Sequence, residues 1–346
     1  MTMSRVAVML AAIDDCHNAS LFYQTRNFCD RDMTPFARIS VIVPCFNAAP
    51  FISATLRSVL SQQSVELEVI VIDDGSTDGS ADLVARSFPA VKLLRQENQG
   101  VAAARNFGLR HARHDWVAFV DADDVWLPGK LAAQCAILSL QGEARMSYTA
   151  WQVWTSDAPN PDAVWLADLR QRAGDTPRWI GATGWIYPEL LLDCVVWTST
   201  VLVQRSLMRE LGGFDPELRL GEDYDLWLRA SRVTQILRVP APYALYRMHP
   251  SSLTKQPTHT NFKHVVVSRA LSNWGYVGPD GRHAPALAVA RSQAKTWSDR
   301  AGARLQSGDL ARARIDAVLA VRACAAHWPA WKVLIKALVR SLFAGR

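Results

Sequence analysis

Apolar residues follow two different spacings along residues 38–154. Short runs rich in Val and Ile are typical of buried strands, and segments with an apolar residue every three or four positions are typical of helices. The expected strands are Ile39–Pro44, Leu67–Ile72, Val91–Leu94 and Trp116–Val120. The expected helices are Ala49–Gln62, Ser80–Ser87, Gly100–Ala112 and Leu131–Leu140. Strands that alternate with helices predict an α/β fold, with a mainly parallel central sheet and helices on both faces.

The pattern is less regular in the rest of the chain. Further strands are expected at Ser147–Trp154, Thr198–Val203 and Ile236–Val239, and further helices at Ser206–Leu211 and Asp223–Arg232. Residues 155–184 predict a long irregular insert, and the pattern from Ala284 onwards is helical. We therefore expect a poorly ordered N-terminal extension over residues 1–37, an α/β domain over 38–255 and a basic helical region over 256–346.

Charge is unevenly distributed along the chain. The whole sequence carries a net charge of +6, and residues 281–346 hold 12 Lys and Arg against 3 Asp, a local +9. The preceding 280 residues therefore carry six minus nine, or −3. This acidic main body argues against a protein that coats nucleic acid. The basic C-terminal segment fits an anionic surface, and it also fits a merely soluble helical tail.

Composition favours an ordinary packed protein, because 49% of the residues are apolar and 20% are charged. The six Cys have no CxxC spacing, so neither a zinc site nor a disulfide framework is indicated, and a reducing cytoplasm fits best. The apolar run Val6–Ile13 is too short for a signal peptide or a membrane span. No other segment reaches the roughly 18 to 20 apolar residues that a spanning helix needs. We therefore expect a cytoplasmic protein.

Three polar loops follow expected strands of the sheet. They are Cys45–Asn47, Asp73–Ser76 and Asp121–Asp124. Each lies at the carboxyl end of its strand, which is the edge where open α/β sheets bind ligands. The sequence therefore predicts one ligand site built from these loops.

The loop Asp121–Asp124 brings several carboxylates together. Asp121 and Asp123 are separated by a small alanine, so one could bind a hard cation directly and the other through water or a ligand hydroxyl. Mg²⁺ and Mn²⁺ take oxygen ligands and usually retain waters and substrate phosphates. The same loop, viewed alone, also fits a turn in which Asp124 caps the following helix.

Four further residue groups could carry chemistry. The carboxylates of Asp73 and Asp74 could accept an N–H group of a base or an O–H group of a ribose, and Arg105 could meet a phosphate or a loop carboxylate. Glu222 and Asp223 stand at an expected helix N-terminus, where a carboxylate stays ionised and could accept a proton. His249 could complete a metal site or contact a pyrophosphate. Viewed alone, these groups also fit a capped turn, a surface ion pair, helix-start acids and a structural histidine, respectively.

The motifs, in their order along the chain, resemble those of the family-2 glycosyltransferases of the GT-A fold. They are PCFNAAPFISATLRSVLSQQ, VIDDGSTDGS, ENQGVAAARNFGL, FVDADDVWLPGKL, GGFDPELRLGEDYDLWLR and YRMHPSSLT. The resemblance covers about residues 38–255. It implies an inverting, metal-dependent sugar transfer from a nucleotide-diphosphate sugar, with a UDP-sugar favoured, to a hydroxyl of a glycan or lipid-linked glycan in cell-surface polysaccharide synthesis.

The resemblance also implies roles for individual residues. Asp223 would be the catalytic base, and Glu222 would help to orient the acceptor. The metal, Mg²⁺ or Mn²⁺, would be held by Asp123 with Asp121 and His249. The predicted donor-binding residues are Pro44, Phe46, Asn47, Asp74, Gly100, Arg105 and Asp121.

Other function classes fit less well. A non-catalytic nucleotide-sugar or carbohydrate binding module would be favoured by loss of Asp223 or of the D-x-D, and both are present. A nucleotidyltransferase usually has a phosphate loop rich in Gly, Arg or Lys after the first strand, where this chain has Pro44–Asn47. A nicotinamide dehydrogenase would need G-x-G-x-x-G at that place.

The last helical segment is basic and amphipathic. Its apolar residues on one face are Trp331, Leu334, Ile335, Leu338, Leu342 and Phe343, whereas Lys332, Lys336 and Arg340 lie elsewhere. This pattern suits a peripheral contact with an anionic membrane, on the inner face of the cytoplasmic membrane. If the protein binds there, a polyprenyl-linked glycan is the expected acceptor. It suits equally a helix packed on the main domain or on a partner.

Overall fold

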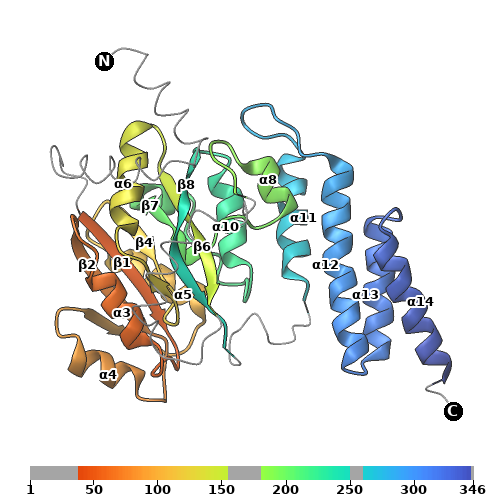
Figure 1. Cartoon of the computed structure of the whole chain (residues 1–346), viewed down its shortest axis with the longest axis horizontal. Helices are drawn as coiled ribbons and strands as arrows, with labels where there is room; N and C mark the ends of the chain where they lie inside the picture. Colours follow the sequence, from red (N-terminus) through yellow and green to blue (C-terminus); the bar gives the residue numbers. More distant parts are fainter. Residues whose placement is uncertain (1–37, 155–180, 250–259, 344–346) are drawn as a thin grey trace.

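The computed structural model describes residues 38–154, 181–249 and 260–343, and its centre is an eight-stranded sheet (Figure 1). The strands lie in the order β3-β2-β1-β4-β7-β6-β8-β5. Their bounds are β1 Arg38–Cys45, β2 Glu66–Asp73, β3 Lys92–Arg95, β4 Trp116–Phe119, β5 Val125–Trp126, β6 Met146–Trp154, β7 Leu202–Gln204 and β8 Ile236–Arg247. Strands β1 to β4 are parallel to one another, as are β6 and β8, whereas β7 and β5 pair antiparallel. The expected mainly parallel sheet is confirmed.

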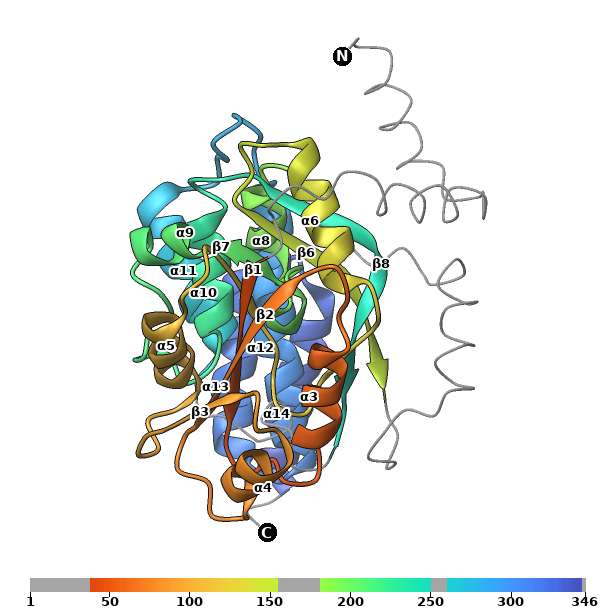
Figure 2. The same ribbon diagram turned by 90° about the vertical axis from the view of Figure 1, so that its left-hand side faces the viewer.

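Helices cover both faces of the sheet, as Figure 2 shows for α5 and α3 on opposite sides of β1. The helices around the sheet are α3 Ile52–Leu60, α4 Ser80–Ser87, α5 Val101–His111, α6 Lys130–Leu140, α8 Tyr187–Leu192, α9 Arg205–Glu210, α10 Glu222–Ala230 and α11 Phe262–Trp274. Successive side chains of a strand point to opposite faces, so Ile42 packs towards α5 and α10 while Val41 and Val43 pack towards α3 and α6. Gly108 of α5 is required at its position, because a Cβ there would lie 2.6 Å from Cγ2 of Ile42.

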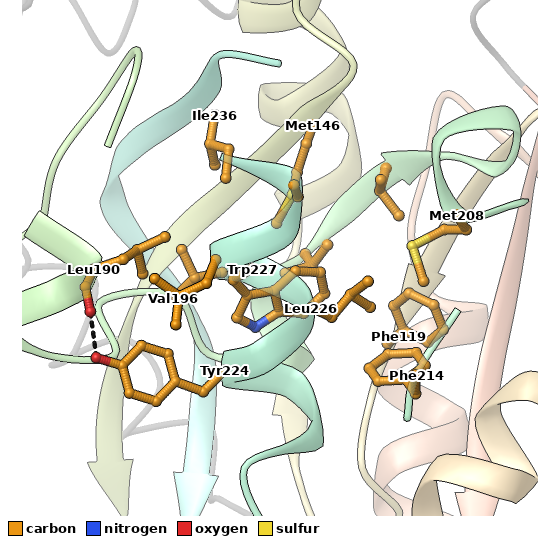
Figure 3. Close-up of a cluster of buried hydrophobic side chains, with 14 of the residues drawn as sticks. Phe119, Met146, Leu190, Val196, Met208, Phe214, Tyr224, Leu226, Trp227 and Ile236 are labelled. Carbon is orange, nitrogen blue, oxygen red and sulfur yellow. Dashed lines mark hydrogen bonds between the residues drawn. The ribbon is translucent and has the colours of Figure 1, made fainter. Parts of the chain in front are cut away.

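Aromatic side chains fill the core on the face that α10 covers. Figure 3 shows Trp227 of α10 between Leu226, Phe214 and Val196, with Phe119 of β4 beside Phe214. The rings of Phe214 and Trp227 lie 6.1 Å apart in an edge-on arrangement, which is a favourable geometry for aromatic pairs. Because Trp227 is completely buried, α10 is held firmly against the sheet at a position five residues after its N-terminus.

The structure corrects the expected strand at Thr198–Val203. Residues Thr198–Thr200 form a 3₁₀ turn, η1, and the strand β7 begins only at Leu202. The turn is stabilised because the backbone N–H of Thr200 donates to the carbonyl of Trp197, and the Thr200 hydroxyl donates to the same oxygen. Thr prefers strands as a β-branched residue, but its hydroxyl can also bond the local backbone, and here this second tendency prevails.

Strand β8 is longer than the alternation predicted. It was expected to end at Val239 but continues to Arg247, beside β6 on one side and β5 on the other. Its pairing with β6 shifts register around Ala150, which lets the strand accommodate Pro240 and Pro242. The extension brings Arg247 and His249 to the loop that follows β4.

Three C-terminal helices follow the α/β core: α12 Ala286–Gln306, α13 Leu310–Ala323 and α14 Trp328–Phe343. Val266 and Val267 of α11 and Val289 of α12 belong to the main core, and α14 is the helix farthest from β2 in Figure 1. No helix in the described ranges is long and apolar enough to cross a membrane. The expected N-terminal extension and most of the insert lie outside the described residues, and the domain boundary at residue 255 stays a prediction.

Candidate active site

The acidic loop after β4 is shaped by its last carboxylate. Asp124 is completely buried; its carboxylate accepts the hydroxyl of Ser199 at 2.6 Å and the backbone N–H of Arg247 at 3.2 Å. Ser199 in turn accepts the backbone N–H of Asp121 at 3.0 Å. Burial and the neighbouring charges of Asp123 and Asp121 raise the pKa of Asp124 well above its usual range. Asp124 therefore fixes the loop from within, rather than capping a helix as the alternative interpretation had it.

Asp123 lies beside His249, which is 126 residues away in sequence. The His249 Nε2 atom is 2.9 Å from Oδ2 of Asp123, and the imidazole packs against the ring of Phe51 with centroids 4.5 Å apart. The long β8 strand brings His249 to this place, and the guanidinium of Arg247 donates to the carbonyl of Asp123 at 2.9 Å. Burial, and then the charge of Asp121, raise the pKa of Asp123.

Arg105 of α5 connects the acidic loop to the N-terminus of α10. Its two terminal nitrogens donate to Asp121 and to Glu222, both at 2.6 Å, and the arginine is 3% exposed. Of the two partners that the sequence suggested for Arg105, a phosphate or a loop carboxylate, the structure contains the loop carboxylate. Its contact with a donor stays a prediction. The charges of Asp121 and Glu222 hold the pKa of Arg105 above its usual range.

Asp223 occupies the first turn of α10 and is held by a residue that sequence reasoning missed. The hydroxyl of Thr198 donates to Oδ2 of Asp223 at 2.8 Å, and the backbone N–H of Tyr224 donates to Oδ1 at 2.7 Å. Gly221 precedes the helix with a φ of 80°, a left-handed conformation that favours glycine. The turn η1 therefore contacts both acidic elements, Asp124 through Ser199 and Asp223 through Thr198. No motif pointed to it, because its residues look like part of a strand.

The predicted donor loops lie at the carboxyl ends of β1 and β2. The Asp74 carboxylate accepts the backbone N–H groups of Gln99 and Gly100, both at 2.9 Å. Asn47 has a φ of 51°, and its side chain accepts the N–H of Thr77 at 2.9 Å. Phe46 is 52% exposed, and Pro44 lies within β1. The loops thus form one hydrogen-bonded rim, and whether they bind a donor stays a prediction.

The site has an excess of negative charge that suits a cation. Among the residues described, five carboxylates, those of Asp121, Asp123, Asp124, Glu222 and Asp223, surround two guanidinium groups, those of Arg105 and Arg247, and their mutual repulsion contributes to the raised pKa values of Asp123, Asp124 and Glu222. No closed set of three or more His, Cys, Asp or Glu ligands is found among the residues described. Asp123 and His249 nevertheless supply an oxygen and a nitrogen side by side. An open site of this kind fits a divalent cation that takes its remaining ligands from phosphates and water.

Glu222 gives the site a testable pH dependence. Burial, and then the charge of Asp223, raise the pKa of Glu222 from 4.5 to about 7, despite its ion pair with Arg105. Between pH 4.5 and about pH 7, Glu222 keeps its proton in the folded protein but has lost it in the unfolded chain. The free energy of unfolding therefore falls as the pH rises through this range. We expect Glu222→Gln to remove the contribution of Glu222 to this pH dependence.

Urea denaturation between pH 4.5 and pH 7 measures the free energy of unfolding of both proteins, with Glu143→Gln, at an exposed position, as the control. An unchanged pH slope in Glu222→Gln would contradict the assignment.

Comparison with known proteins gives one consistent result. The sequence profile described as Glycosyl transferase family 2 matches residues 40–142. The Escherichia coli protein WfgD, named as a UDP-Glc:alpha-D-GlcNAc-diphosphoundecaprenol beta-1,3-glucosyltransferase, is 29% identical over 62% of this chain and 79% of its own. An uncharacterised glycosyltransferase of Rickettsia typhi is 25% identical over 57% of this chain, and the match spans only 60% of that relative's length. The structure of S. aureus TarS 1–349 in complex with UDP-GlcNAc has a TM-score of 0.57 at 17% identity, covering 83% of this chain and 81% of that one, and it shares the fold.

Proposed function

This chain belongs to glycosyl transferase family 2 and has a GT-A-like fold, and we propose that it transfers a sugar from a UDP-sugar to a hydroxyl group of a lipid-linked glycan. The observation that supports this most directly is the bridge made by Arg105. It joins the acidic loop, where a diphosphate would be bound, to the helix that carries a carboxylate suited to proton abstraction. A sugar transferase needs these two functions side by side.

Asp223 is the base in this proposal. It lies at the N-terminus of α10, where the helix dipole favours the ionised carboxylate, and Thr198 fixes the orientation of its side chain. The ionised carboxylate accepts the proton of the acceptor hydroxyl while the hydroxyl oxygen forms a bond to the anomeric carbon of the donor. The bond between that carbon and the diphosphate breaks in the same displacement, so the configuration inverts. Glu222 and Arg105 keep Asp223 and the acidic loop in a fixed relation.

Asp123 and His249, with Asp121 beside them, would hold Mg²⁺ or Mn²⁺. When bound, the cation would neutralise charge on the departing nucleotide diphosphate as a Lewis acid. Asp74, Asn47 and the rim around them would bind the nucleoside. The choice of UDP, and of a polyprenyl-diphosphate-linked acceptor in cell-surface polysaccharide synthesis, is supported by the name of the E. coli relative.

Metal-dependent binding of UDP is the first expected result. Isothermal titration of UDP, GDP and TDP into the wild type should show binding of UDP that requires Mn²⁺ and is lost in Asp123→Ala, because that variant lacks the half-buried carboxylate that would hold the metal with His249. Asp115→Ala is the matched control, since the Asp115 side chain is 95% exposed. Binding of no diphosphate, with or without Mn²⁺, would contradict the proposal and favour a binding module for carbohydrate alone.

A further inference from the structure

The C-terminal helix α14 has one face of small residues and one of large ones. Ala330 and Ala337 are completely buried, and Ala337 packs with Leu305 of α12 and Ala313 of α13. Five large apolar residues are exposed: Trp328, Trp331, Ile335, Leu338 and Val339, which we call the α14 strip. The sequence pattern left open whether this helix packs on the protein or meets a membrane. The structure shows that its alanine side serves packing and leaves most of the large residues outside.

The α14 strip is continuous along the helix. Its members recur at intervals of three and four residues, a spacing that places them on one side of a helix. Trp328 is 62%, Ile335 51% and Leu338 47% exposed. Single exposed apolar residues are common on protein surfaces, but a row of them that includes two tryptophans marks an interaction surface.

Basic side chains run along one edge of the strip. Lys332, Lys336 and Arg340 are all exposed. Because they are spaced four residues apart, they lie on one side of the helix, next to the α14 strip. The described part of α14 has no acidic residue. An apolar row with tryptophans beside a cationic row is the composition of helices that lie in the interface of a bilayer.

We propose that the α14 strip docks the protein onto an anionic membrane surface. The helix would lie in the plane of the interface, with Trp328, Ile335 and Leu338 among the acyl chains and the lysines at the lipid phosphates. A second copy of this chain is a poorer occupant, because pairing two strips would bring two segments of charge +9 together. An anionic lipid surface complements that charge.

Vesicle co-sedimentation tests the membrane contact directly. Purified full chain is mixed at low salt with vesicles of phosphatidylcholine alone, or of phosphatidylcholine with phosphatidylglycerol. We expect binding to the mixed vesicles only. Lys332→Gln/Lys336→Gln should weaken it about 30-fold, from about 1 kcal/mol for each basic residue near such a surface. The control Arg57→Gln/Arg86→Gln removes the same charge from exposed positions of the catalytic domain and should bind like wild type.

A second pair of variants tests the apolar part of the contact. Ile335→Ser/Leu338→Ser should lose most of the binding, whereas Leu287→Ser, which alters an apolar residue of α12 that is 52% exposed, should retain it. Circular dichroism checks that each variant is folded. Absence of binding to anionic vesicles, binding that neither α14 variant changes, or self-association that depends on the strip would each overturn membrane docking. The assay uses neither donor nor acceptor, so its outcome is independent of the proposed sugar transfer.

Discussion

Asp223→Asn should lower kcat by roughly 10²- to 10⁴-fold, the usual contribution of a general base. Asparagine has the same shape; its oxygen can accept the N–H of Tyr224 while its NH2 group donates to the Thr198 hydroxyl, but it cannot take up a proton. The measurement is UDP release from UDP-glucose with a GlcNAc-diphospho-polyprenyl acceptor, the pair that the E. coli relative is named for. Binding of UDP by titration should remain close to that of wild type.

Two companion measurements separate a base from a merely structural carboxylate. Thr198→Val removes the hydroxyl that orients Asp223 and should give a smaller loss of kcat, which Thr198→Ser should restore. In Asp223→Asn the pKa of Glu222 should also move down towards its usual value, because the charge of Asp223 contributes to raising it. Retention of more than about a tenth of the wild-type kcat in Asp223→Asn would assign the base to another group.

The sheet and its ligand edge could be predicted from the sequence because their signals are local. Runs such as Val41–Val43 are buried on both faces, and each predicted loop follows its strand directly. Glycine is favoured at two helix starts in the structure, since Gly100 and Gly221 both have positive φ there. These elements form as predicted because tertiary packing favours the same conformation as the local sequence does.

The contact between Asp123 and His249 was expected from the family resemblance, but local patterns could not predict it. It depends on β8 continuing through Pro240 and Pro242, which look like strand breakers, and on β5, a strand of only two residues. A pairing so short has no periodicity to detect. The 3₁₀ turn at Thr198 was missed for a related reason, since in addition to its local bonds to Trp197 it bonds Asp223 and Asp124, which lie far away in sequence.

Arg105 is the residue whose loss should destabilise the fold of the site most. Arg105→Met leaves Asp121 and Glu222 without their ion-pair partner, and Glu222 is buried, so we expect a loss of about 3–5 kcal/mol in the free energy of unfolding. Lysine has a single ammonium group and cannot span both carboxylates as the planar guanidinium does, so Arg105→Lys should recover only part of this loss. Urea denaturation at pH 7 measures both variants.

Much of this cost comes from Glu222, which without Arg105 is buried as an unpaired carboxylate or has to take up a proton. Glu222→Gln in the Arg105→Met background should therefore regain about 1–3 kcal/mol, and lowering the pH, which protonates Glu222, should reduce the penalty of Arg105→Met in the same direction. Arg113→Met is the matched control, because Arg113 pairs with the buried Glu68 at 2.8 Å but is itself 76% exposed. Its loss should cost no more than about 1 kcal/mol. If Arg105→Met lowers the free energy of unfolding as little as Arg113→Met does, solvent screens the ion pairs of Arg105. Arg105 then does not hold the acidic loop and α10 in a fixed position relative to each other.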